Sequence, residues 1–130
     1  MVLFVCHSNA GLSPMAEAIF RYLEPQILVQ SAGLRSTHVR PLVKRVLEEE
    51  RIDAFGLFSK DLFGVDLSEV QFAVGLCLPH EAPRLPSRIQ TRWWGIPDPL
   101  CAPPEEQLED FRALRDELLR RIPKLVSEIS

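Results

Sequence analysis

Strand-length apolar runs alternate along this chain with amphipathic stretches. Short runs rich in β-branched and aromatic residues predict strands, and apolar side chains that return every three or four residues predict helices. The expected strands are residues 2–5, 27–29, 72–78 and 91–94, and the expected helices are residues 14–24, 41–51 and 103–122, with a short one within 61–70. This alternation is typical of an α/β fold: a parallel sheet with helices on both faces and right-handed crossovers.

Serine and proline mark the expected helix ends. Ser13 is predicted to cap the first helix, with Pro14 at its first position, and Pro123 is expected to kink or interrupt the last one. The buried face predicted for the first helix is Met15, Ala18, Ile19, Tyr22 and Leu23.

The composition favours a reduced, cytoplasmic protein. At 130 residues the chain is expected to be one domain, residues 1–130, and 46% apolar residues are enough for a core. A net charge of −3 gives no reason to expect nucleic acid or an acidic membrane surface as a partner. The apolar run at the N-terminus is only as long as a strand, so neither a signal peptide nor a spanning helix is expected. Three cysteines, an odd number, do not suggest a disulfide framework.

The stretch with the clearest chemistry joins the first strand to the first helix. Cys6 stands at the carboxyl end of the strand, and small or polar residues follow up to Ser13. The backbone N–H groups of such a loop and the dipole of the helix create an anion site. The same field stabilises a thiolate, so Cys6 is expected to lose its proton readily and to act as a nucleophile beneath a bound oxyanion.

This opening, VLFVC to SPMAEAIFR, resembles that of the low-molecular-weight protein tyrosine phosphatases and the related thioredoxin-coupled arsenate reductases. The resemblance covers nearly the whole chain and implies a flavodoxin-like, four-stranded parallel sheet in the order 2-1-3-4. Cys6 matches the nucleophile, Asn9 the loop asparagine and Ser13 the serine that hydrogen-bonds the thiolate. Ser31, in a Ser-Ala-Gly triplet, would hold Asn9, and Asp98, before a proline, matches the general acid. The substrate-binding loop implied by the resemblance is His7, Ser8, Asn9, Ala10, Gly11 and Leu12.

Leu12 departs from the family pattern, because the family has arginine there. No other side chain provides the planar fork that clamps two oxygens of an oxyanion. Losing one preorganised oxyanion donor typically costs ~10²–10³ in rate. Arg35 or Arg40 could replace it from the loop after the second strand, as could an arginine of a partner. His7 could add a cation near neutral pH.

The other cysteines bear on which reaction is expected. Cys77 matches the second thiol of the thioredoxin-coupled arsenate reductases, and residues 94–99 also resemble that branch. Those reductases use three thiols in turn. No cysteine lies around residues 83–84, where the third is expected, and Cys101 is the only cysteine left to supply it. Arsenate reduction with a thioredoxin-type reductant and phosphomonoester hydrolysis therefore both remain open. The alternative from another class is an inactive pseudophosphatase that binds an anion or a phosphorylated partner.

No metal or cofactor is expected. Cys77 and His80 have a ligand-like spacing, but structural zinc sites usually have two short paired motifs, and the chain has one. A response-regulator receiver shares the architecture. It is disfavoured because no acidic pair follows the first strand.

Overall fold

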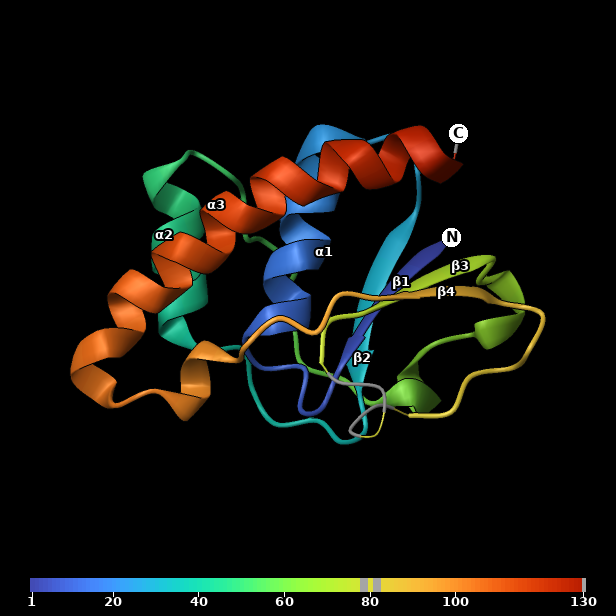
Figure 1. The fold of residues 1–130 in the computed structure, drawn as a ribbon, viewed down its shortest axis with the longest axis horizontal. Helices are drawn as coiled ribbons and strands as arrows, with labels where there is room; N and C mark the ends of the chain where they lie inside the picture. The colour runs from blue at the N-terminus through green and yellow to red at the C-terminus, as the bar shows by residue number, and fades with distance from the viewer. Residues whose placement is uncertain (78–79, 81–82, 130) are drawn as a thin grey trace.

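Four parallel strands form one sheet in the computed structural model, which describes residues 1–77, 80 and 83–129. The strands are β1 (Val2–Cys6), β2 (Val29–Gly33), β3 (Phe72–Gly75) and β4 (Gln90–Trp93), in the order β2-β1-β3-β4 (Figure 1). Val2 pairs with Val29 on one side and with Phe72 on the other. The expected strand order is confirmed.

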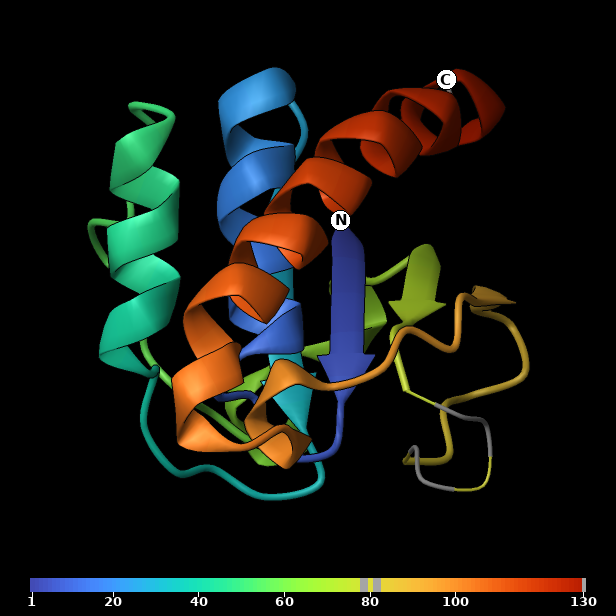
Figure 2. The ribbon, with the colours of Figure 1, turned by 60° about the vertical axis from the view of Figure 1, so that its left-hand side comes forward.

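Three α-helices cover one face of this sheet. They are α1 (Leu12–Leu23), α2 (Pro41–Glu49) and α3 (Pro104–Ile129), and α3 crosses in front of α1 in Figure 2. The other face is covered by the connection that carries the 3₁₀ helices η1 (Leu62–Gly64) and η2 (Leu67–Glu69). Both faces are therefore covered, as expected, but all three α-helices share one of them.

Alternation along β1 creates the two halves of the core. Val2 and Phe4 pack with the α-helices, whereas Leu3 and Val5 pack with Val65 and other residues on the opposite face. All five residues of β1 are buried, as a central parallel strand requires.

A buried arginine ties α2 to α3. The guanidinium of Arg115 donates through Nη1 to the Val46 carbonyl at 2.9 Å and to Glu49 at 2.8 Å. Arg112 also binds Glu49, so one carboxylate at the end of α2 holds two cations of α3. This link fixes the part of α3 that packs above the loop after β1.

Several predicted boundaries were wrong. β2 begins at Val29 rather than 27, because Leu28 is largely exposed, and it continues through Ser31 to Gly33. β3 ends at Gly75, and Leu78 lies outside the described residues. α3 continues through Pro123 without interruption. Tyr22, expected on the buried face of α1, is exposed.

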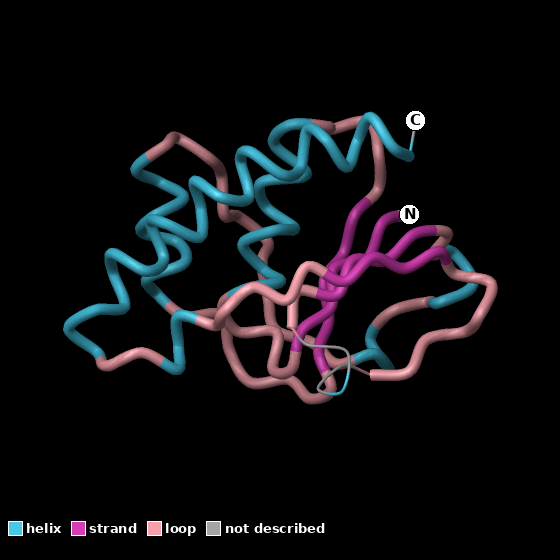
Figure 3. The backbone as a smooth tube through the Cα atoms, viewed as in Figure 1, coloured by secondary structure: helices cyan, strands magenta, loops and turns pink. Residues whose placement is uncertain are grey.

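The loops gather where the parallel strands end. In Figure 3 the pink segments after β1, β2 and β3 crowd at the carboxyl edge of the sheet. This is the edge at which open α/β sheets bind ligands. In the described part of the chain, no helix combines the length and apolarity needed to cross a membrane.

Candidate functional site

The loop between β1 and α1 is held against the end of β2. A Cβ on Gly33 would lie 2.8 Å from both the Asn9 nitrogen and the His7 carbonyl oxygen, so only glycine allows this approach. The Leu34 N–H donates to the same His7 carbonyl at 2.8 Å. The turn after β2 therefore determines where the loop runs.

Asn9 is the buried centre of the loop. Its backbone is left-handed (φ 50°), which asparagine tolerates better than most residues. Its Oδ1 accepts from the Lys60 N–H at 2.8 Å, while Nδ2 donates to Ser13 Oγ at 2.8 Å and Ser31 Oγ at 3.0 Å. The predicted contact between Ser31 and Asn9 is thus present.

Ser13 lies against Cys6 instead of capping the helix. The N-cap is Gly11, without a side-chain bond, and Ser13 sits inside the first turn. Its Oγ lies 2.8 Å from Cys6 Sγ, and the Asn9 N–H lies 3.3 Å from the same sulfur. The expectation that Ser13 caps α1 was wrong, and the hydroxyl is available to the thiol.

Burial opposes ionisation of Cys6. It raises the pKa of the thiol above its usual value, against the opposing hydrogen bonds from Ser13 and Asn9, and the negative charge of Asp98 raises it further. That Cys6 reacts as a thiolate stays a prediction, and burial is the factor that opposes it.

Leu12 forms an apolar wall where the family has arginine. Its side chain is buried in the core cluster with Phe111 and also lines the cavity above the loop. Arg35 is exposed. The Arg40 N–H donates to the Ala10 carbonyl at 3.1 Å, but its guanidinium lies 2.6 Å from His38 and does not line the cavity.

A cavity of about 550 Å³ brings the predicted residues together at the carboxyl edge of the sheet. Loop residues, two cysteines and the segment before Asp98 enclose it; the lining is His7, Ser8, Leu12, Cys77, Gly95, Ile96, Pro97, Asp98 and Cys101. No lysine or arginine is among these described residues. Cys6 lies buried at the end of β1 and does not line the cavity. Ala10 and Gly11 are not among the lining residues either: the Ala10 carbonyl accepts from the Arg40 N–H, and Gly11 lies against Phe111.

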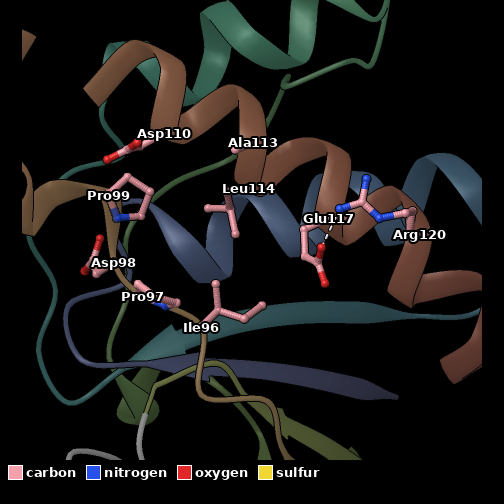
Figure 4. Close-up of a pocket in the computed structure, with 9 residues that line it drawn as sticks. All are labelled: Ile96, Pro97, Asp98, Pro99, Asp110, Ala113, Leu114, Glu117 and Arg120. Atoms are coloured by element: carbon pink, nitrogen blue, oxygen red, sulfur yellow. Dashed lines mark hydrogen bonds and ion pairs between the residues drawn. The ribbon is translucent and has the colours of Figure 1, made fainter. Parts of the chain in front are cut away.

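Asp98 lies between this cavity and a second one. Its side chain accepts from the Leu100 N–H at 2.9 Å and so caps η4 (Pro99–Cys101), which positions Cys101. The second cavity, about 380 Å³, lies between the Asp98 segment and α3 (Figure 4). It also contains the Glu117–Arg120 ion pair.

Two residues of the site were not predicted from the sequence. The backbone of Lys60 holds Asn9, and Glu17, buried on α1, accepts from Ser31. A glutamate among the apolar positions of α1 was the available signal for Glu17. Over residues 1–77, 80 and 83–129, no group of three histidine, cysteine, aspartate or glutamate side chains is placed to hold a metal ion.

This fold and this loop define the phosphatase-like class of α/β proteins. The chain belongs to the low molecular weight phosphotyrosine protein phosphatase family, whose model matches residues 1–130. It is 30% identical over 135 residues to a glutaredoxin arsenate reductase of Synechocystis, covering 99% of this chain and 98% of that one. The structure of an arsenate reductase from Archaeoglobus fulgidus has a TM-score of 0.83 at 30% identity, covering 98% of this chain and 99% of that chain.

Similarity to phosphatases is also present. The low molecular weight protein-tyrosine-phosphatase YfkJ of Bacillus subtilis is 33% identical over 85 residues, 58% of this chain and 54% of that protein. The matches thus support an enzyme of the tyrosine phosphatase or arsenate reductase kind.

Proposed function

We propose that this protein reduces arsenate, with Cys6 as the nucleophile and Cys77 as the second thiol. The observation that carries the proposal is the placement of Cys77 and Asp98 on one cavity above the Cys6 loop. A hydrolase needs no second thiol at this position, whereas a thiol-based reductase does. The full-length similarity to arsenate reductases supports the same choice.

The reaction follows from these positions. The Cys6 sulfur forms a bond to arsenic(V), and an arsenate oxygen leaves as water after Asp98 gives it a proton. The Cys77 thiolate then attacks the Cys6 sulfur, and the S–As bond breaks with its electron pair going to arsenic. Arsenite leaves as arsenic(III), and the two electrons come from the two thiols, which become a Cys6–Cys77 disulfide.

Cys101 is the remaining thiol on the same cavity. It is exposed, whereas Cys6 and Cys77 are buried. Its thiolate would attack Cys77, release Cys6 and carry the disulfide to the surface. A dithiol protein of the thioredoxin or glutaredoxin type would then reduce that disulfide.

Backbone N–H groups of the loop would bind the oxyanion without a guanidinium. Leu12 makes this binding weaker than a loop with arginine, since a bidentate charge-assisted contact is missing. We therefore expect a high concentration of arsenate to be required for half-maximal rate.

The experiment is arsenate-dependent formation of arsenite with a thioredoxin or glutaredoxin system as reductant. We expect turnover by the wild type and none by Cys6→Ser or Cys77→Ser. Cys101→Ser separates the transfer of the disulfide to the surface from the reduction of arsenate itself. A single turnover should persist in this variant, and multiple turnovers should slow. Equal turnover by Cys77→Ser and the wild type would refute the reductase proposal.

A second function is favoured by one observation, the lack of any lysine or arginine among the described residues that line the cavity. Together with the raised pKa of Cys6, this suits a pseudophosphatase that binds a phosphorylated partner without turnover. Tight binding of a phosphopeptide, with neither arsenate reduction nor phosphate release, would select it. Release of phosphate that requires Cys6 and Asp98 but not Cys77 would instead select phosphomonoester hydrolysis.

A further inference from the structure

Glu17 is a buried carboxylate that the proposed reaction does not use. It lies on α1 beneath the loop, 4% exposed. Its Oε1 accepts from Ser31 Oγ at 2.7 Å and lies 3.5 Å from Lys60 Nζ, and its Oε2 lies 2.5 Å from Arg21 Nη2. An ionised carboxylate at such depth requires these cations and hydrogen bonds.

The hydrogen bonds between Glu17 and Cys6 can run in only one direction. The Lys60 N–H is a donor only, so Asn9 must turn Oδ1 toward it and present its NH₂ group to Ser13 and Ser31. Both serine oxygens therefore act as acceptors for Asn9. Each hydroxyl hydrogen must then point to its other neighbour.

That neighbour is Glu17 for Ser31 and Cys6 for Ser13. Ser31 donates to a carboxylate, and Ser13 donates to the sulfur at 2.8 Å. Glu17 accepts the hydroxyl hydrogen of Ser31 and so holds the Ser31 oxygen where it accepts from Asn9. Asn9 thereby stays bridged between the two serines.

We propose that Glu17 is a positioning residue that anchors this series of hydrogen bonds through Ser31, so that the Ser13 hydroxyl stays in place to donate to Cys6. Lys60 and Arg21 pair with its carboxylate. The proposal rests on Cys6 being the reactive thiol of the proposed function. It adds a residue that acts on Cys6 through Ser31, Asn9 and Ser13 rather than by contact.

Coulomb's law alone makes the opposite prediction for this carboxylate. A negative charge near Cys6 disfavours the thiolate, so removing it would lower the thiol pKa, particularly with Lys60 and Arg21 left in place. If Glu17 acts through the hydrogen bonds of Ser31, Asn9 and Ser13, removing it loosens the donation from Ser13 and raises that pKa. The sign of the change therefore separates the two roles.

The test measures the pH dependence of alkylation of Cys6 by iodoacetamide. Trypsin would release residues 1–21, in which Cys6 is the only cysteine. Mass spectrometry of this peptide follows the modification of Cys6, so Cys77 and Cys101 need not be substituted. Asp98, the acidic group that raises the pKa of Cys6, is unchanged in every variant.

We expect Glu17→Gln to slow alkylation about tenfold at a fixed pH below the thiol pKa, which corresponds to a rise of about one in pKa. Ser31→Ala, which breaks the chain without changing charge, should act in the same direction. Glu49→Gln is the matched control. Glu49 also pairs with two cations, but it contacts neither the loop nor the hydrogen bonds that connect Glu17 to Cys6. It should leave the alkylation profile of Cys6 unchanged.

The double variant Glu17→Gln/Lys60→Met keeps the test valid if the single variant fails to fold. It removes the Glu17 carboxylate and the Lys60 ammonium group together, so neither of these two buried charges remains unpaired by loss of the other. The same slowing is expected. Unchanged or faster alkylation in the folded Glu17 variants would overturn the proposal. Alkylation needs no arsenate, so failure of the reductase proposal would leave this result interpretable.

Discussion

Replacing Leu12 by arginine should convert the apolar wall of the cavity into an anion clamp. Leu12 is 2% exposed and packs in the core cluster. Burying a leucine side chain contributes about 1.5–3 kcal/mol, and the methylene stem of arginine recovers part of it. We expect Leu12→Arg to lower the free energy of unfolding by about 2 kcal/mol when no anion is bound.

An oxyanion should reverse this loss. Ligand at 100 times its dissociation constant stabilises a folded protein by about 2.7 kcal/mol. Phosphate should therefore return Leu12→Arg to about the stability of the wild type, and should stabilise the wild type less. Thermal unfolding across a series of phosphate concentrations measures both effects.

The kinetic assay is hydrolysis of a small aryl phosphate, with Cys6→Ser as the blank. A restored oxyanion donor should raise the rate of Leu12→Arg by ~10²–10³ over the wild type. Leu12→Met is the matched control, because it nearly conserves apolar volume and adds no charge. The reasoning is refuted if Leu12→Arg binds phosphate no more tightly than Leu12→Met, or if the wild type hydrolyses the ester well above the blank.

Three further changes test the framework of the site. Gly33→Ala should displace the loop backbone by forcing a Cβ into it, seen as a lower melting temperature together with altered alkylation of Cys6; a change in melting temperature alone would contradict this. Hydrogen bonds from Arg112 lower the pKa of Glu49 from 4.5 to about 2. The ionised Glu49 therefore stabilises the fold fully above about pH 4.5, and this stabilisation is lost as the pH falls toward 2. In acid titrations the stability difference between the wild type and Glu49→Gln should shrink over that window, and a constant difference would show that the ion pair between Glu49 and Arg112 does not stabilise the fold. Arg115→Met removes a buried charged donor from the Val46 carbonyl, so denaturant unfolding should show a loss of about 1.5–3 kcal/mol; an unchanged midpoint would show that the contact contributes nothing.

Secondary structure was predicted correctly where the local pattern of apolar residues is sufficient. It was predicted wrongly where contacts with other strands determine the boundaries of an element. Val2–Cys6 is recognisable as a strand because every side chain is apolar and every one is buried. β2 was misplaced because Ser31 and Gly33 are small and polar-leaning, yet they pair with Phe4 and Cys6 of β1. Leu28 has the composition of a strand residue and is exposed.

Resemblance predicted the members of the site better than their chemistry. Cys77 and Asp98 were expected at the carboxyl edge of the sheet, and they line one cavity there. The resemblance also placed Ser13 beside the thiol, whereas the local Ser-Pro pattern assigned it to a helix cap. In the structure the Ser13 hydroxyl lies 2.8 Å from the Cys6 sulfur.

The sequence by itself determined the strand–loop–helix unit, the order of chemical groups along it and the absence of arginine at position 12. These depend on neighbouring residues, whose period and spacing are visible in one dimension. The tertiary structure decided that Cys6 is buried against Ser13 and that contacts through Asn9 and Ser31 connect this pair to Glu17. Desolvation and hydrogen-bond direction depend on partners such as Ser31 and Lys60, which are 22 and 51 residues from Asn9 and meet it only in the folded chain.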